Sequence, residues 1–338
     1  MRVVISPDHS VPVVAVNIWY DVGSRDELDG QRGWAHLFEH LMFSGSAHVD
    51  SGEHLHLLQS LGGSVNATTW FDRTNYFETV GLGALDLALW LEGDRLATLA
   101  DHLAEASVET QREVVKEEKR QRYDNVPYGQ AMAELAVLVF GADHPYGHTT
   151  IGSMADIDAA TAASAADFFR AHYRPGNAVI TLVGDVQPKD ALKRVDRALG
   201  WIPTTSRPPR TPATPLPPLT GIPRKTLTDP VPAAASYLAW RLPPRDTPEF
   251  DACDLALSIL GAGQSARECL TELPRFDSRA DAISAYATLH SDPERINRRL
   301  AEVEAVDAAQ VQLAAATYLA PDSRAQLDYT DGTPDATA

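Results

Sequence analysis

Cysteine is scarce in this chain, and long apolar runs are missing from it. Its two cysteines, Cys253 and Cys269, are too few for a disulfide framework. No stretch of about 18 or more apolar residues occurs, so no membrane-spanning helix is expected. Residues 1–5 enter a strand-like run at once and lack the apolar core of a signal peptide. These features predict a protein of the reducing cytoplasm.

Basic residues are also in the minority. Lys and Arg number 29 against 46 Asp and Glu, which gives a net charge of −17. This balance argues against nucleic-acid binding, which needs a basic surface. It would favour basic peptides by long-range attraction, although a high acidic charge often serves solubility alone. With 44% hydrophobic and 22% charged residues, the 338-residue chain has the composition of a globular protein of two domains.

Strand-like and helical segments alternate along the first part of the chain. β-branched and aromatic residues predict strands at 13–20, 74–80 and 177–186. Helices are expected at 33–44, 51–61, 85–99, 103–124, 128–140, 161–173 and 188–199. This mixture predicts an α+β fold, in which a sheet has helices on one side.

A proline-rich stretch divides the chain. Residues 203–223 contain eight prolines, and proline at this density favours an extended connector. A strand expected at 234–242 and a helix at 249–260 begin the second half. We therefore predict a first domain over 1–202, a connector over 203–223, a second domain over 224–330 and a tail over 331–338.

The run from His36 to His40 carries the clearest chemistry. On a helix, His36 and His40 point the same way and Glu39 shares their face. Two such imidazoles can hold zinc while a carboxylate that is not a ligand acts on the metal-bound water. The order His-x-x-Glu-His is the inverzincin pattern. Chance can produce such a short pattern, but ionisable groups among apolar neighbours are costly to bury unless paired or metal-bound.

Catalytic zinc usually takes a third protein ligand and leaves one position for water. The acidic helix expected at 103–124 is the best source of that ligand. Glu118 lies at helical spacing from Val114 and Val115, whereas Glu117 falls among basic residues on the charged face. Spacing alone leaves both glutamates open and favours Glu118.

The segment Gly-Trp-Ala-His-Leu-Phe-Glu-His-Leu-Met-Phe-Ser-Gly-Ser at 33–46 resembles the zinc helix of the pitrilysin family, the M16 peptidases. The nearest branch is that of the mitochondrial processing peptidases and their bacterial relatives. Further likeness is found at 66–77, 144–147 and 173–178. The resemblance implies two related sheet-plus-helices domains of the M16 type, one zinc ion per chain and peptidase activity.

The same resemblance suggests roles for further residues of the first half. In the family, the third ligand closes an Arg-x-x-Val-x-x-Glu-like helix, and residues 112–118 place Glu118 there. Gln111 stands where the family often has a second Glu, so ligation should survive while the surroundings of the ligand differ. Asn66 would contact the substrate, and a turn residue is an equal alternative.

Other aromatic and histidine residues of the first half give weaker indications of function. Trp70 and Phe71 could line a side-chain pocket, but core positions are favoured. His54 and His56 are two residues apart, so a helix would separate them, and both are expected on the surface.

The second half starts like a repeat of the first but is shorter, as if middle strands and a helix were missing. In the family, an Arg and a Tyr of the second half help bind the substrate carbonyl. Arg279 and Tyr286 have a suitable interval, yet their neighbours fit the closing helices better, where Arg279 would be exposed. A partner chain would then supply both residues, as in close relatives. The resemblance thus implies a homodimer, or a heterodimer with an M16 partner subunit.

Two functions follow from these residues. In the first, the chain is a zinc endopeptidase of extended peptides or leader segments. Zinc lowers the pKa of its water to about 7, and Glu39 moves the proton to the leaving amine. In the alternative, the chain is a non-catalytic assembly or peptide-binding subunit. The intact motif favours the first function, and the shortened second half favours the second.

Overall fold

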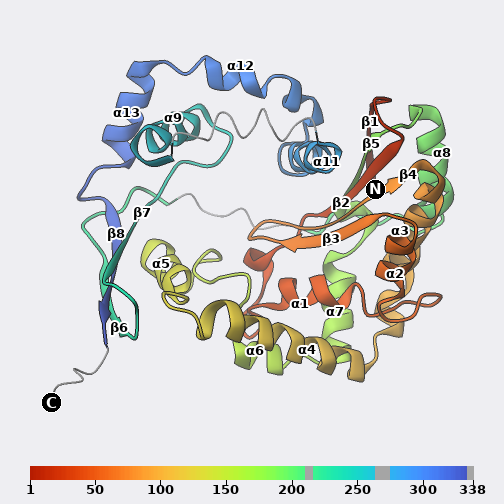
Figure 1. Ribbon diagram of the computed structural model, residues 1–338, viewed down its shortest axis with the longest axis horizontal. Helices are drawn as coiled ribbons and strands as arrows, with labels where there is room; N and C mark the ends of the chain where they lie inside the picture. The colour runs from red at the N-terminus through yellow and green to blue at the C-terminus, as the bar shows by residue number, and fades with distance from the viewer. Residues whose placement is uncertain (210–215, 263–274, 333–338) are drawn as a thin grey trace. The chain divides into compact units, whose positions relative to one another are not determined.

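The computed structural model describes residues 1–209, 216–262 and 275–332, which form two compact units (Figure 1). Among the described residues, unit 1 comprises 1–115, 150–209 and 275–297, and unit 2 comprises 116–149, 216–262 and 298–332. The spatial units therefore differ from the predicted order of two consecutive domains, because segments of each half of the chain pack into the unit of the other half.

Unit 1 is built on a five-stranded sheet with the strand order β1-β5-β2-β4-β3. β1 runs parallel to β5, and the other neighbours are antiparallel. β2 and β5 lie inside the sheet and are buried along nearly their whole length, as their apolar, β-branched sequences require. The strands are β1 (Arg2–Pro7), β2 (Val13–Tyr20), β3 (Ser64–Thr69), β4 (Thr74–Gly81) and β5 (Ala178–Gly184).

One face of this sheet is covered by α11 (Phe276–Ala285), a helix from the second half of the chain (Figure 1). Its Phe276, Ala280 and Ile283 pack against Ala15 and Val183. Asp281 of the same helix accepts hydrogen bonds from the side chains of Trp19, at 2.7 Å, and Asn75, at 2.9 Å. Because alternate strand residues point to opposite faces, these contacts define one face of the sheet.

The opposite face carries α1 (Trp34–Leu41), which lies across the sheet from α11 (Figure 1). Phe38 of α1 packs 5.5 Å from the ring of Tyr173, and the hydroxyl of Tyr76 donates to its carbonyl at 3.3 Å. Tyr76 is adjacent to Asn75 in β4, so the two side chains point to opposite faces.

The remaining helical segments of unit 1 surround this core. α4 begins in unit 1 and ends just beyond its boundary. The helices are α2 (Glu53–Ser60), α3 (Leu85–His102), α4 (Glu105–Lys119), α6 (Met154–Asp158), α7 (Ala162–His172) and α8 (Pro188–Leu199), with short turns η1 (Ser24–Asp26), η2 (Leu82–Ala84), η4 (Pro175–Asn177), η6 (Tyr286–His290) and η7 (Pro293–Asn297).

Unit 2 contains a three-stranded sheet with the order β6-β8-β7. α5 (Ala131–Phe140) packs on it, with Ala131 and Leu135 against Leu327 and Tyr329. Cys253 is buried beside Ala314, and Cys269 lies outside the described residues. The other elements are β6 (Arg224–Asp229), β7 (Ala235–Trp240), β8 (Arg324–Asp331), η3 (Arg120–Asp124), α9 (Pro248–Leu257), η5 (Ser258–Ala262), α12 (Arg299–Glu304) and α13 (Ala308–Tyr318).

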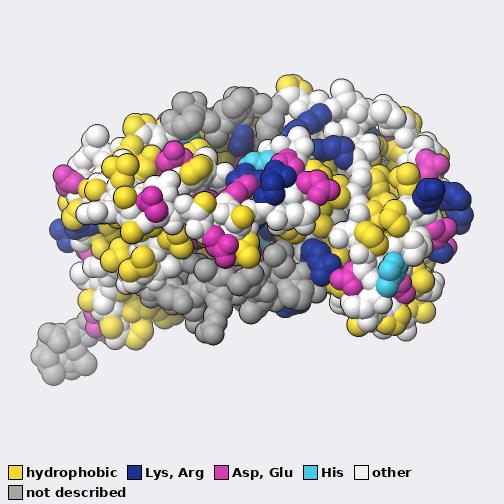
Figure 2. Space-filling view, turned by 90° about the horizontal axis from the view of Figure 1, so that it is seen from above, with side chains coloured by type: hydrophobic (Ala, Val, Ile, Leu, Met, Phe, Trp, Pro, Cys, Tyr) yellow, Lys and Arg dark blue, Asp and Glu magenta, His cyan; other side chains and the backbone are white. Residues whose placement is uncertain are grey.

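Charged side chains of both signs occur on the face of the molecule drawn in Figure 2. Basic and acidic side chains are interleaved among hydrophobic ones on the face seen in Figure 2. Within the described part of the chain, no helix has both the length and the apolar character needed to cross a lipid bilayer.

Candidate metal centre

The N-terminus of α1 is fixed by a carboxylate from the preceding loop. Glu27 accepts hydrogen bonds from the backbone N–H groups of Gly33, at 3.0 Å, and Ala35, at 2.8 Å. A negative charge here satisfies N–H groups that have no partner within the helix and offsets the positive end of the helix dipole. Gly33 has a φ of 101°, which a residue with a side chain rarely adopts. The loop therefore sets where α1 begins.

His36 and His40 lie one turn apart on α1, and Glu118 reaches them from the last turn of α4. One potential ligand atom of each residue lies within 4.8 Å of those of the other two, and all three residues are half-buried. The two imidazole rings are 4.9 Å apart at an interplanar angle of 81°. Two imidazole nitrogens and one carboxylate oxygen are the donor set of a catalytic zinc site. The residues present therefore fit zinc.

The short helix α6 accepts hydrogen bonds from both α1 and α4, the helices that carry these side chains. The indole N–H of Trp34 in α1 donates to the carbonyl of Asp156 at 3.0 Å. Arg112 in α4 donates to the carbonyl of Asp158 at 2.8 Å. The unit boundary falls within α4, but the helix is continuous to Lys119, so the position of Glu118 follows from the anchored part of the helix.

Glu117 and Glu118 have different surroundings. The Glu118 side chain is 19% exposed and accepts a hydrogen bond from Arg122 at 2.8 Å. The Glu117 side chain is 53% exposed, and hydrogen bonds from Gln121 and Arg120 lower the pKa of its carboxyl group. The expectation that Glu117 belongs to the charged face is confirmed.

Glu39 is half-buried beside the edge strand β3. Its Oε2 accepts a hydrogen bond from the hydroxyl of Thr69, the last residue of β3. This contact ties the carboxylate to the edge of the sheet. Thr69 is not among the residues predicted from the sequence, because a threonine at a strand end carries no distinctive signal.

Two family models match this chain. The model described as "Insulinase (Peptidase family M16)" matches residues 2–139, and the model described as "Peptidase M16 inactive domain" matches residues 159–308. The chain belongs to the M16 peptidase family. Both its two-domain M16 architecture and its resemblance to M16 peptidases are thereby confirmed.

Individual relatives of this M16 chain include proteins named as zinc proteases. Zinc protease PqqE of Helicobacter pylori is 35% identical over 194 residues, which cover 57% of this chain and 43% of that protein. An uncharacterized zinc protease of Mycobacterium bovis is 31% identical over 290 residues, 86% of this chain and 65% of that protein. The chain thus spans about half to two thirds of these relatives.

A solved structure has the same fold. The crystal structure of a protease from Helicobacter pylori superposes with a TM-score of 0.84, covering 97% of this chain and 96% of that one at 21% sequence identity. The similarity supports the M16 fold along nearly the whole chain.

Asn66 lies inside β3, so its interpretation as a turn residue is wrong. Its side chain is exposed and its Oδ1 accepts the N–H of Ala67 at 2.8 Å. Gln111 is half-buried on α4, seven residues before Glu118.

The hairpin that follows β3 exposes an aromatic side chain. Trp70 is 56% exposed, which contradicts the expectation that it belongs to the core. Phe71 is half-buried, with its ring 5.3 Å from that of Trp70. Trp70 is exposed because it occupies the loop of the hairpin, where its backbone N–H donates to the carbonyl of Arg73 at 2.8 Å.

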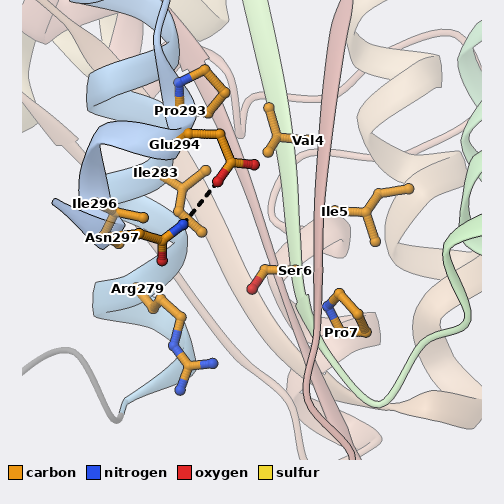
Figure 3. Close-up of a pocket in the computed structure, with 10 residues that line it drawn as sticks. All are labelled: Val4, Ile5, Ser6, Pro7, Arg279, Ile283, Pro293, Glu294, Ile296 and Asn297. Carbon is orange, nitrogen blue, oxygen red and sulfur yellow. Dashed lines mark hydrogen bonds between the residues drawn. The ribbon is translucent and has the colours of Figure 1, made fainter.

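Arg279 and Tyr286 do not join the M16 metal centre. Arg279 lies on α11, across the sheet from Glu39, and pairs with Asp8 at 2.9 Å. Hydrogen bonds from Ser10 and Arg279 lower the pKa of Asp8 to about 2. Arg279 lines a cavity of about 640 Å³ between β1 and the segment 279–297 (Figure 3).

The position of Arg279 corrects one expectation. Arg279 is 23% exposed rather than open to solvent, because the ion pair holds it against the sheet. Tyr286 begins η6, directly after α11, and the guanidinium of Arg295 lies 5.9 Å from its ring. Neither side chain is brought to Glu39 by this chain.

A second polar group is buried in unit 1, and we call it the Arg95 cluster: His54, Glu78, Glu92 and Arg95. His54 is only 4% exposed, so its expected surface position is wrong. The burial of His54 carries no local sequence signal, because it depends on α2 packing over α3 and the sheet. His56, by contrast, is exposed as expected.

The charges of the Arg95 cluster balance without a metal. Ligand-type atoms of His54, Glu78 and Glu92 lie within 4.8 Å of one another. However, both terminal oxygens of Glu92 accept hydrogen bonds from Arg95. Burial, followed by the charge of Glu92, raises the pKa of Glu78 well above its usual value, which favours its neutral form. Arg95 and Glu92 then form a cation–anion pair, and an added divalent ion would lie beside the Arg95 guanidinium.

Proposed function

We propose that this chain is a zinc endopeptidase that hydrolyses peptides bound in extended form. His36, His40 and Glu118 would hold the ion, which when bound supplies an activated water and polarises the scissile carbonyl. The observation that carries the proposal is the convergence of two imidazoles and one carboxylate from α1 and α4, with Glu39 beside them.

Glu39 is the proposed general base. It accepts a proton as water attacks the peptide carbonyl and then delivers this proton to the leaving amine. The hydroxyl of Thr69 holds Oε2 of Glu39, which restricts the orientations of the carboxylate. A base that is held in place loses less entropy when the reaction begins.

The substrate would bind along β3. β3 is an edge strand of the five-stranded sheet as the described residues form it. An extended peptide can join such an edge through main-chain hydrogen bonds, while side-chain pockets give specificity. Because Thr69 ends this strand and contacts Glu39, a peptide lying along β3 would pass the proposed base. Asn66 would lie beneath the bound peptide on the same strand.

The test compares three variants of the purified chain. Glu39→Gln keeps the size of the side chain and should retain zinc while lowering turnover by about 100-fold or more, the usual contribution of a general base. His40→Ala should lose zinc and activity together. His56→Ala removes an exposed histidine of α2 and serves as the control. Metal analysis and peptide cleavage are measured for each; unchanged cleavage by Glu39→Gln, with zinc bound, rules out this assignment.

A non-catalytic assembly or peptide-binding role is the second candidate. It is favoured by the match to a model described as an inactive domain and, within the described residues, by a second sheet of three strands against five in the first. The position of Arg279 on α11, paired with Asp8 on the face of the sheet opposite α1, favours a related arrangement. In it, a second copy or an M16 partner subunit supplies the Arg and Tyr that complete the site.

A further inference from the structure

The guanidinium of Arg95 is enclosed by aromatic rings as well as by the carboxylate of Glu92. Its central carbon lies 4.5 Å from the ring centre of Tyr76 and 5.1 Å from that of Phe43. Arg95 is 2% exposed and Tyr76 is 1% exposed. A cation over an aromatic face is attractive, and the attraction grows when water is excluded. Arg95 therefore holds the rings of Tyr76 and Phe43 in place.

Tyr76 and Phe43 each also donate a hydrogen bond to α1, the helix that carries the histidines. The Tyr76 hydroxyl donates to the carbonyl of Phe38, the residue just before Glu39, at 3.3 Å. The N–H of Phe43 donates to the carbonyl of His40 at 3.1 Å. Burial, followed by the neighbouring Tyr173, raises the pKa of Tyr76, so its hydroxyl remains a donor at neutral pH.

We propose that Tyr76, supported by Arg95, is a positioning residue that sets the orientation of His40 and Glu39 on α1. The inference rests on the proposed function, because it concerns how the zinc ligands and the base are held. α1 has eight residues, and a helix this short depends on contacts outside itself. A displacement of the Phe38 carbonyl would move the backbone of Phe38 and His40, the residues on either side of Glu39.

A purely stabilising role for the Arg95 cluster makes a different prediction. In that case, removing any buried hydroxyl near Arg95 would alter stability and leave the metal centre unchanged. Tyr20 provides the matched control. It lies on the same side of the sheet, is 0% exposed and has its ring 6.0 Å from that of Tyr76. Within the described residues, its hydroxyl has no hydrogen-bond partner.

The experiment compares Tyr76→Phe with Tyr20→Phe in the full chain. Zinc affinity is measured by chelator competition, ligand geometry by the absorption spectrum of the Co²⁺-loaded protein, and kcat and KM with a peptide. Tyr76→Phe should weaken zinc binding and lower kcat, each about fivefold, alter the cobalt spectrum and leave KM unchanged, in line with the loss of the hydrogen bond to the Phe38 carbonyl. The substitution also removes the 3.4 Å contact of the Tyr76 hydroxyl with that of Tyr173. Tyr20→Phe should match the wild type in all of these.

The outcomes separate this inference from the proposed function. If the wild type binds Zn²⁺ and Co²⁺ but Tyr76→Phe shows the same affinity and spectrum, the positioning role is wrong and the metal site stands. The same conclusion follows if Tyr20→Phe changes both readouts equally. If the wild type binds neither metal, the proposed function fails and this inference fails with it.

Discussion

Two neighbouring glutamates near the end of α4 illustrate how much one step along a helix changes. Successive residues are rotated by about 100° around the helix axis. This rotation turns Glu118 toward the two histidines and leaves Glu117 53% exposed. Val115, which is fully buried, rather than Val114, which is 43% exposed, marks the inward face that leads to Glu118.

The two glutamates allow a matched pair of substitutions. Glu118→Ala should weaken zinc binding by more than the roughly 10–100-fold typical of residues that only support a ligand. Glu117→Ala should keep the wild-type affinity, because its carboxylate bonds to Arg120 and Gln121. Competition with a chromophoric chelator measures both. Loss of zinc by the Glu117 variant, with normal binding by the Glu118 variant, would reverse the assignment.

At this scale, the sequence predicted the three residues that converge as candidate ligands, and the proposed base, better than the residues that support them. His36, His40 and Glu39 follow from a local pattern, and helical spacing gave Glu118 as the favoured third residue. Thr69 and Tyr76 approach α1 only because β3 and β4 pair and pack beneath it. Such contacts between distant segments leave no periodic signal in one sequence.

Among the elements that carry the candidate site, the short helix α1 depends on contacts outside itself. An isolated helix of fewer than about 12 residues is marginal in water. α1 has eight residues and no side-chain cap of its own, so the Glu27 carboxylate takes that role.

Glu27→Ala should therefore lower the free energy of unfolding by about 1 kcal/mol, the usual effect of losing a helix cap. Zinc affinity should fall as well, because His36 lies in the first turn of α1. Asp29→Ala, in the exposed part of the same loop, should change neither property. Denaturant unfolding and metal titration test this. Equal stability of the two variants would show that Glu27 does not cap the helix.

The predicted elements agree best where the sequence is strongly periodic. The strand expected at 13–20 is β2, and the helix expected at 188–199 is α8. The helix expected at 33–44 ends earlier, at Leu41, because the chain turns toward Gly45, which has a φ of 106°. β6, β8 and α6 were missed. They are short or partly polar, and tertiary pairing rather than local preference holds them.

At the scale of the whole molecule, the proposed peptidase activity depends on whether a chain of this length is sufficient to form the complete site. The chain spans 43% of one named relative and 65% of another, and the described residues of its second sheet form three strands. The pairing of Arg279 with Asp8 directs attention to a second chain.

We expect the purified chain to cleave a random peptide mixture, with cleavage abolished by a chelator and restored by zinc. Mass spectrometry of the products, with the chain alone and with a candidate M16 partner subunit, measures this. Zinc binding with cleavage only after the partner is added would favour the heterodimer. Zinc binding without cleavage in either case would favour the non-catalytic role, and cleavage that survives the chelator would exclude a zinc mechanism.

The position of α11 on the first sheet also matters while the protein is being made. β5 leaves the ribosome about 90 residues before α11, which at roughly 5–20 residues per second corresponds to about 5–20 s. During that interval, the sheet face with Ala15, Trp19 and Val183 has no helix over it. A nascent chain halted after the proline-rich connector would keep this apolar surface open to chaperones and to other unfinished chains.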